Sequence, residues 1–188
     1  MVVFEGTFTC GECHDTENMY LVDELSGTIK CEADDGGCVQ HGESSKRIMH
    51  VWGTGCTCAD RLVLRGLTFY KGKAVYGGGL VIDYEAVLTL ELCIFSRCYG
   101  TTAGGGGAIE AMSGTLDLFA VSFALNYGNN CGDDIESFQA TISVYGNCPN
   151  GYGGDTSRGE RQNFTHFSPP YPLILTQQNP FLNEQDRD

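Results

Sequence analysis

Aliphatic residues at alternate positions recur along the middle of the chain, in triplets whose first and third residues are apolar. The triplets are Leu62-Val63-Leu64, Leu88-Thr89-Leu90, Leu116-Asp117-Leu118 and Ile142-Ser143-Val144. Their first residues are 26, 28 and 26 positions apart. A fixed period in the range of about 20–50 residues is typical of solenoids and propellers, so this repeat indicates the architecture of the chain.

The alternation predicts strands, because successive side chains of a strand point to opposite faces. The first and third residues of each triplet are expected to point inward and to stack in columns. The middle residues, Val63, Thr89, Asp117 and Ser143, are expected to point to solvent. The next corner is expected to hold the phenylalanines that follow the triplets, Phe69, Phe95 and Phe123, together with Leu67 and Val121. We therefore predict an all-β fold, a single-stranded right-handed parallel β-helix (solenoid) of about four to six turns.

The chain divides into three parts. Residues 1–60 contain strand-like segments separated by turn clusters, and are predicted to form irregular N-terminal coils of the β-helix. Residues 61–148 carry the regular repeat and form the regular coils. Residues 149–188 are polar and contain too little apolar surface to offset chain entropy, so we expect a mostly unstructured or loosely packed C-terminal tail.

Ten cysteines occur in local clusters, which is the pattern expected of disulfides between neighbouring turns. They are Cys10, Cys13, Cys31, Cys38, Cys56, Cys58, Cys93, Cys98, Cys131 and Cys148. The spacing within the first and third pairs also suits zinc, but two pairs of matching geometry are not evident, and disulfides are favoured. Disulfides predict a secreted or cell-surface location. Asn163 begins a tripeptide that fits the N-glycosylation pattern Asn-x-Ser/Thr, which is consistent with a secreted location. The first residues do not resemble a secretory signal, so we expect the chain to be a fragment.

The net charge of −13, with 24 acidic and 11 basic residues, bears on the partners. No stretch gathers Lys and Arg into a stripe that could neutralise phosphates, so nucleic acid is not expected as a partner. No apolar run approaches the ~20 residues of a membrane span, so membrane insertion of this segment is not expected either.

Two short motifs add a resemblance. Residues 106–109 (Gly-Gly-Ala-Ile) and 123–126 (Phe-Ala-Leu-Asn) resemble the paired GGAI and FxxN repeats of bacterial polymorphic membrane proteins. Related pectin-lyase-like repeats occur in large secreted or cell-surface proteins of algae, and this cysteine-rich chain looks more like those. The resemblance covers residues 61–147. It implies a right-handed parallel β-helix, and it leaves function open because bacterial members act as adhesins while other β-helices are enzymes.

Carboxylates support an enzyme interpretation. With the aliphatic residues inward, Glu110, Asp134 and Glu136 are expected to face outward on adjacent turns, ~4.8 Å apart. Such a cluster suits glycoside hydrolysis, or a calcium site made of Asp133, Asp134 and Glu136 for β-elimination. The aspartate pair at 133–134 also resembles that of polygalacturonases, whose remaining motifs are missing here. The alternative, which we favour, is that Asp133 occupies a tight turn and that the glutamates form a solvated face.

Outward-facing aromatic and apolar side chains support a binding interpretation. Phe119 and Tyr145 are expected to align one turn apart, and Met112 and Phe138 to align likewise on the next face. In one interpretation they form a platform that binds sugar rings or a protein partner. In the other, the tail or a sister domain covers them. On another face, Arg65 and Glu91 align as an exposed ion pair.

The sequence leaves three functions open. The first is an extracellular structural or adhesive module, non-catalytic and without a cofactor, that binds a glycan or a surface protein. The second is a polysaccharide lyase or glycoside hydrolase that uses Glu110, Asp134 and Glu136. The third is a truncated gene product with no independent role.

Overall fold

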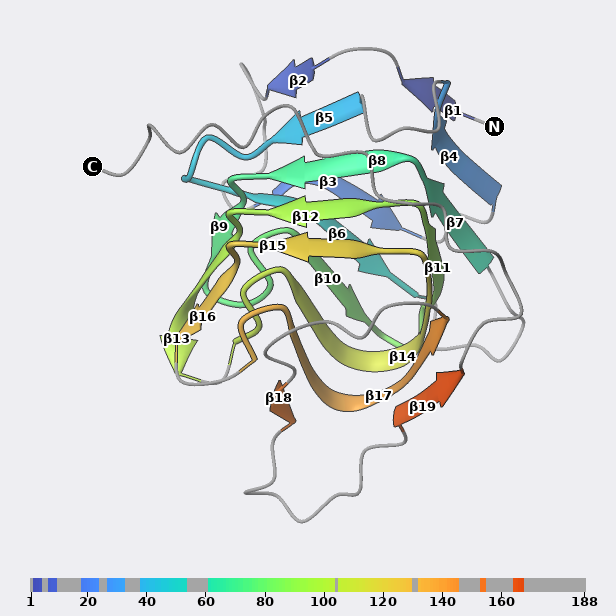
Figure 1. Cartoon of the computed structure of the whole chain (residues 1–188), viewed down its shortest axis with the longest axis vertical. Coiled ribbons are helices and arrows are strands. Elements are labelled where there is room, and N and C mark those ends of the chain that lie inside the picture. Colours follow the sequence, from blue (N-terminus) through green and yellow to red (C-terminus); the bar gives the residue numbers. More distant parts are fainter. Residues whose placement is uncertain are drawn as a thin grey trace.

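The computed structural model describes residues 2–4, 7–9, 18–23, 27–32, 38–53, 61–103, 105–129, 132–145, 153–154 and 164–167. Within these residues every regular element is a β-strand, and parallel strands stack as a β-solenoid of about three turns (Figure 1). The predicted all-β solenoid is therefore confirmed. The described residues contain fewer complete turns than the expected four to six.

Each complete turn passes through the same succession of strands. The first contains β6 (Arg47–Trp52), β7 (Arg61–Arg65), β8 (Leu67–Tyr70) and β9 (Lys73–Ala74). The second contains β10 (Leu80–Asp83), β11 (Val87–Glu91), β12 (Ile94–Ser96) and β13 (Tyr99–Ala103). The third contains β14 (Ile109–Phe119), β15 (Ser122–Ala124) and β16 (Tyr127–Asn129). The long strand β14 pairs with both β10 and β11, so it spans two sides of the turn.

Partial turns precede and follow these three. The earlier strands are β1 (Val2–Phe4), β2 (Thr7–Thr9), β3 (Asn18–Asp23), β4 (Gly27–Cys31) and β5 (Cys38–His41). The later strands are β17 (Ile135–Tyr145), β18 (Gly153–Gly154) and β19 (Phe164–Phe167). Three parallel sheets result: an 11-stranded sheet, the five-stranded sheet β15-β12-β8-β5-β2 and the three-stranded sheet β16-β13-β9. We call them sheets A, B and C.

The predicted aliphatic columns are present in sheet A. Strand register aligns Leu62 with Leu88, Leu116 and Ile142, and aligns Leu64 with Leu90, Leu118 and Val144. All eight side chains are buried. The alternation along each strand and the length of each turn together produce this core, because parallel pairing in register stacks equivalent residues.

The predicted phenylalanine column lies in sheet B. Phe69 and Phe95 stack with ring centroids 4.5 Å apart and an interplanar angle of 4°. Phe95 and Phe123 stack at 5.5 Å and 15°. Phe95 is therefore covered on both ring faces, and burial of such a side chain contributes about 1.5–3 kcal/mol.

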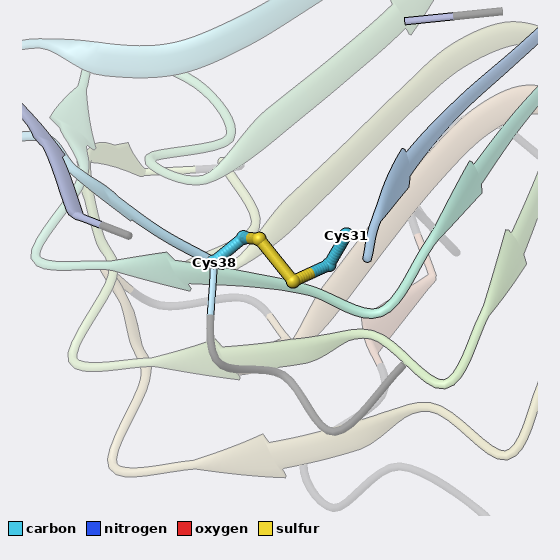
Figure 2. The surroundings of a disulfide bond; sticks show 2 residues. All are labelled: Cys31 and Cys38. Carbon is cyan, nitrogen blue, oxygen red and sulfur yellow. A yellow bond between two sulfur atoms is a disulfide. The ribbon is translucent and has the colours of Figure 1, made fainter. Parts of the chain in front are cut away.

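One predicted disulfide is confirmed. Cys31 at the end of β4 is bonded to Cys38 at the start of β5, with a Cα–Cα distance of 5.5 Å (Figure 2). It closes the corner between sheets A and B before the first complete turn. Cys10, Cys13, Cys56, Cys58, Cys131 and Cys148 lie outside the described residues, as does Asn163.

The prediction of disulfides at Cys93 and Cys98 is wrong in this structure, where both are buried free thiols. Each thiol points inward and donates to a carbonyl of the preceding turn: Cys93 to Leu64 O at 3.4 Å and Cys98 to Phe69 O at 3.6 Å. Burial raises the pKa of both thiols to about 12. Both cysteines serve as small core residues. The number and spacing of the cysteines in the sequence did not distinguish this role from a disulfide.

Candidate functional site

The candidate carboxylates come together, but inside the molecule. Glu110 of β14 and Glu136 of β17 are aligned partners in sheet A. Their exposed fractions are only 4% and 2%, and that of Asp134 is 4%. The prediction of an outward, solvated face is therefore wrong for these three residues. The strands do place both glutamates opposite the aliphatic column, as the alternation predicts; their side chains turn back to the loop that precedes each strand.

Each glutamate holds the loop that leads into its own strand. The Gly106 N–H donates to Glu110 Oε2 at 2.7 Å, and the Gly132 N–H donates to Glu136 Oε2 at 3.3 Å. Both bonds connect residues four positions apart. The glutamates thus satisfy loop N–H groups that would otherwise be buried without a partner, an arrangement that repeats from one turn to the next.

Asp134 has a different internal partner. Asn126 donates through Nδ2 to Asp134 Oδ1 at 2.9 Å and to Phe95 O at 3.1 Å. The Oδ1 atom of Asn126 accepts a hydrogen bond from the Cys98 N–H at 3.0 Å. The last residue of the FxxN motif therefore ties two turns to the loop before β17. Neighbouring Asp133 is exposed and accepts the Gly128 N–H at 3.1 Å.

Burial dominates the electrostatics of this cluster. The pKa of Glu110 is raised to about 8, chiefly by burial and also by the negative charge of Glu136, while the Gly106 hydrogen bond and the Arg47 guanidinium act in the opposite direction. Arg47 is itself buried and donates to Asn18 Oδ1 at 2.6 Å and to Tyr76 O at 3.1 Å. A carboxyl group with a raised pKa can serve as a general acid, but this one lies under a loop.

The three aspartate and glutamate residues of the calcium interpretation do not converge. Asp133 bonds to Gly128, Asp134 to Asn126 and Glu136 to Gly132. Among the described residues, no group of three or more His, Cys, Asp or Glu side chains could hold a metal ion. The geometry assigns these carboxylates to loop fixation.

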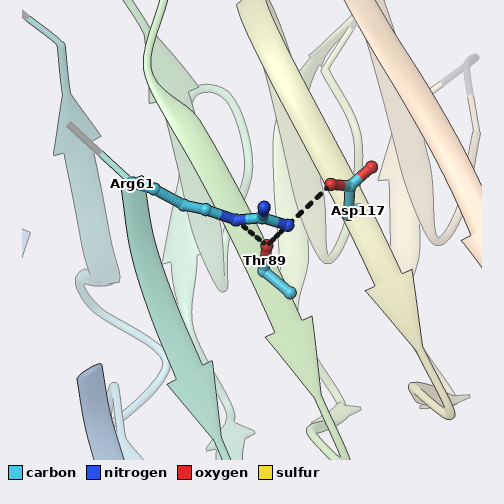
Figure 3. A network of polar contacts seen from close by, with 3 residues as sticks. All are labelled: Arg61, Thr89 and Asp117. Atoms are coloured by element: carbon cyan, nitrogen blue, oxygen red, sulfur yellow. Dashed lines mark hydrogen bonds and ion pairs between the residues drawn. The ribbon is translucent and has the colours of Figure 1, made fainter. Parts of the chain in front are cut away.

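Opposite charges are paired on the outer face of sheet A. Arg61 donates through Nε and Nη2 to Thr89 Oγ1, at 3.0 and 2.9 Å, and its Nη2 forms an ion pair with Asp117 Oδ2 at 3.2 Å (Figure 3). The prediction that Thr89 is exposed to solvent is therefore wrong, because the Arg61 side chain covers it and Thr89 is buried. The expected ion pair between Arg65 and Glu91 is confirmed at 3.2 Å.

The predicted aromatic alignment is confirmed in sheet A. Phe119 and Tyr145 stack with centroids 4.2 Å apart and an interplanar angle of 3°. The register of the flanking residues also places Met112 beside Phe138, and both are half-buried. Because the rings of Phe119 and Tyr145 cover one another face to face, they present edges outward, which is a poor platform for stacking a sugar ring.

A second aromatic ladder was not identified from the sequence. Tyr99 and Tyr127 of sheet C stack at 5.1 Å and 7°, and their exposed fractions are 36% and 50%. Sheet C and the segments flanking it supply most of the exposed large apolar side chains among the described residues: Val75, Tyr76, Tyr99, Leu125 and Tyr127, with Tyr84 elsewhere. A signal was present, because residues 73, 99 and 127 follow the same steps of 26 and 28 as the aliphatic triplets.

Comparisons with protein-family models, with curated proteins and with solved structures give no match to this chain. In the part of the chain that the structure describes, no helix is long and apolar enough to cross a membrane. Function therefore has to be inferred from the geometry of this chain itself.

Proposed function

We propose that this chain is an extracellular structural or adhesive β-solenoid module, which recognises a glycan or a surface protein and catalyses no reaction. The observation that carries the proposal is the ordered display of exposed side chains around sheet C, led by Tyr99 and Tyr127. Stacked parallel strands hold these side chains at a fixed spacing, so little conformational entropy is lost when a partner binds.

The internal bonding of the carboxylates supports a non-catalytic role. Glu110 and Glu136 each accept a loop N–H, and Asp134 accepts from Asn126. A pair of catalytic carboxyl groups has to flank the bond that it cleaves. The two glutamates instead face the backbone of the loops before their strands, and Asp134 faces the Asn126 side chain.

Two further features support an extracellular setting. The Cys31–Cys38 disulfide is of a kind that persists in oxidising compartments. The GGAI and FxxN repeats resemble those of polymorphic membrane proteins and pectin-lyase-like surface proteins, among which bacterial members act as adhesins.

The enzyme alternative is favoured by one observation, the raised pKa of Glu110 beside Glu136. A polysaccharide lyase or hydrolase would use Glu110 in its protonated form as the acid and a neighbouring carboxylate as the base. It would require the loop around residues 105–108 to open and admit the substrate.

One set of measurements distinguishes these functions. The chain is screened on a glycan array and against cell surfaces, and in parallel it is assayed for new reducing ends and for unsaturated uronates. We expect binding without turnover. Turnover that is lost in both Glu110→Gln and Asp134→Asn would establish the enzyme, whereas a folded chain that neither binds nor turns over any substrate would refute both.

A further inference from the structure

Six outward-facing residues form a lattice at the corner where sheet B meets sheet C. Each complete turn contributes two of them, one immediately before and one immediately after a buried residue that points inward. The buried residue is Gly72 in the first turn, Cys98 in the second and Asn126 in the third. We call this set the Lys/Tyr corner, and its members are Lys71 and Lys73, Arg97 and Tyr99, and Leu125 and Tyr127. In Figure 1 it lies where β8, β12 and β15 lead into β9, β13 and β16.

Strand register aligns these residues in two columns. Lys73 pairs with Tyr99, and Tyr99 pairs with Tyr127. In the other column the Lys71 N–H donates to Ser96 O, next to Arg97, and the Arg97 N–H donates to Ala124 O, next to Leu125. Neighbouring members of a column are therefore separated by about one strand spacing, ~4.8 Å.

The three cations of the corner have no carboxylate partner in the part of the chain that the structure describes. Within the described residues, ion pairs occupy Arg61 and Arg65 of sheet A, and none involves the cations of the corner. Lys71 and Lys73 instead lie over tyrosine rings, with Nζ 5.2 Å from the Tyr70 centroid and 5.6 Å from the Tyr99 centroid. A local positive patch thus exists on a chain whose net charge is −13.

The tyrosines favour an anionic ligand over a neutral sugar ring. Tyr99 has Lys73 on one face and Tyr127 on the other. What it offers outward is the ring edge, the positive side of the aromatic quadrupole, and a phenolic hydroxyl that can donate a hydrogen bond. The edge, the hydroxyl and the cations all attract negative charge.

We propose that the Lys/Tyr corner binds a sulfated polysaccharide, which deepens the proposed recognition function and rests on it. Two of the three cations are lysines, which act as point charges and do not select the planar geometry of a carboxylate; only Arg97 carries a planar guanidinium. A sulfate ester directs three oxygens toward different donors, so that one group reaches an ammonium and a hydroxyl on adjacent turns. A polymer repeats this contact along the column.

An acidic peptide fits the corner less well. The backbone groups of sheet C already bond from turn to turn, and a peptide lying across the side chains gains none of the main-chain hydrogen bonds of an added strand. An acidic side chain lies at each end of the corner. Exposed Glu43 lies on the preceding turn, and exposed Asp133 lies beside Gly128. They repel the polyanion beyond the corner and so confine it to these turns.

The test uses the whole chain and four probes: dextran sulfate, carboxymethyl-dextran, unmodified dextran and poly-L-glutamate. We expect dextran sulfate to bind at least tenfold more tightly than the other three, with an affinity that falls as salt is added. The triple variant Lys71→Gln/Lys73→Gln/Arg97→Gln should lose at least tenfold. The double variant Tyr99→Phe/Tyr127→Phe, which keeps the rings and removes the hydroxyls, should lose several-fold.

The matched control removes three cations elsewhere, as Lys30→Gln/Arg61→Gln/Arg65→Gln on the outer face of sheet A, and should stay within twofold of the unmodified chain. An equal loss in the control would show that only net charge matters and would overturn the site. Equal or tighter binding of carboxymethyl-dextran or poly-L-glutamate would overturn the choice of sulfate. If dextran sulfate does not bind but an array glycan does, this inference fails while the recognition function stands.

Discussion

Glu110 lies beside Glu136 on neighbouring strands, and each carboxylate accepts the N–H of the residue four positions before it. Two acidic groups thus replace solvent as the acceptors of two loop N–H groups. The two bonds occur one turn apart, on β14 and β17, whereas the aligned position of β10 holds Val81. The glutamates therefore fix the loops of these two turns.

The first prediction concerns pH. Burial holds the pKa of Glu110 at about 8, above its ordinary value of 4.5, so the folded chain binds a proton that the unfolded chain has released. Stability from this group is complete below pH 4.5 and declines as the pH rises toward 8. Glu110→Gln should remove that decline, with a gain relative to the unmodified chain on the order of a few kcal/mol at pH 8.

Urea unfolding midpoints at pH 5, 6, 7 and 8 measure this effect. The control is Glu91→Gln, which removes the same charge from a part-buried ion pair at the surface of sheet A. If the two variants depend on pH in the same way, the buried glutamate does not titrate as described.

The second prediction concerns Asn126. Asn126→Ala removes the bonds to Phe95, Cys98 and Asp134 and leaves buried polar groups without a partner. The expected loss in the free energy of unfolding is about 2–4 kcal/mol. The adjacent variant Leu125→Ala, at a side chain that is 67% exposed, should change it by less than about 0.5 kcal/mol. Equal losses in urea unfolding would contradict the role of the FxxN asparagine.

The third prediction concerns the phenylalanine column. Phe95 is buried between Phe69 and Phe123, whereas Phe123 ends the described column and is half-buried. Phe95→Ala should cost about 3–5 kcal/mol because it leaves a cavity, and Phe123→Ala should cost clearly less. Thermal unfolding of the two variants compares these costs, and a larger loss at Phe123 would mean that the column is covered differently.

The fourth prediction concerns the free thiols. Because burial raises the pKa of Cys93 and Cys98 to about 12, iodoacetamide at pH 8 should modify neither in the folded chain. Both should react after unfolding in urea without reductant, and Cys31 and Cys38 only after reduction. Peptide mass spectrometry reads out all four sites. A peptide in which Cys93 or Cys98 is disulfide-bonded in the unreduced protein would refute the assignment.

The core of this fold follows from local information. Alternation decides which face of a strand each residue occupies, and the steps of 26 and 28 decide which residues share a column, so Leu64, Leu90, Leu118 and Val144 were predictable as vertical neighbours. The same steps relate residues 73, 99 and 127. The tyrosine ladder was thus also accessible from the sequence, since an exposed column obeys the same register as a buried one.

The environment of the polar groups was not accessible in this way. The strands, their parallel stacking and the direction in which Glu110 leaves its strand follow from the amino-acid sequence alone, because they depend on periods of 2 and about 26 residues. Three features are visible only in the folded molecule: a loop covers that glutamate, Asn126 reaches Asp134, and Cys93 has a core position instead of a disulfide partner. Burial and pairing depend on the path of the loops in three dimensions, and no repeat encodes that path.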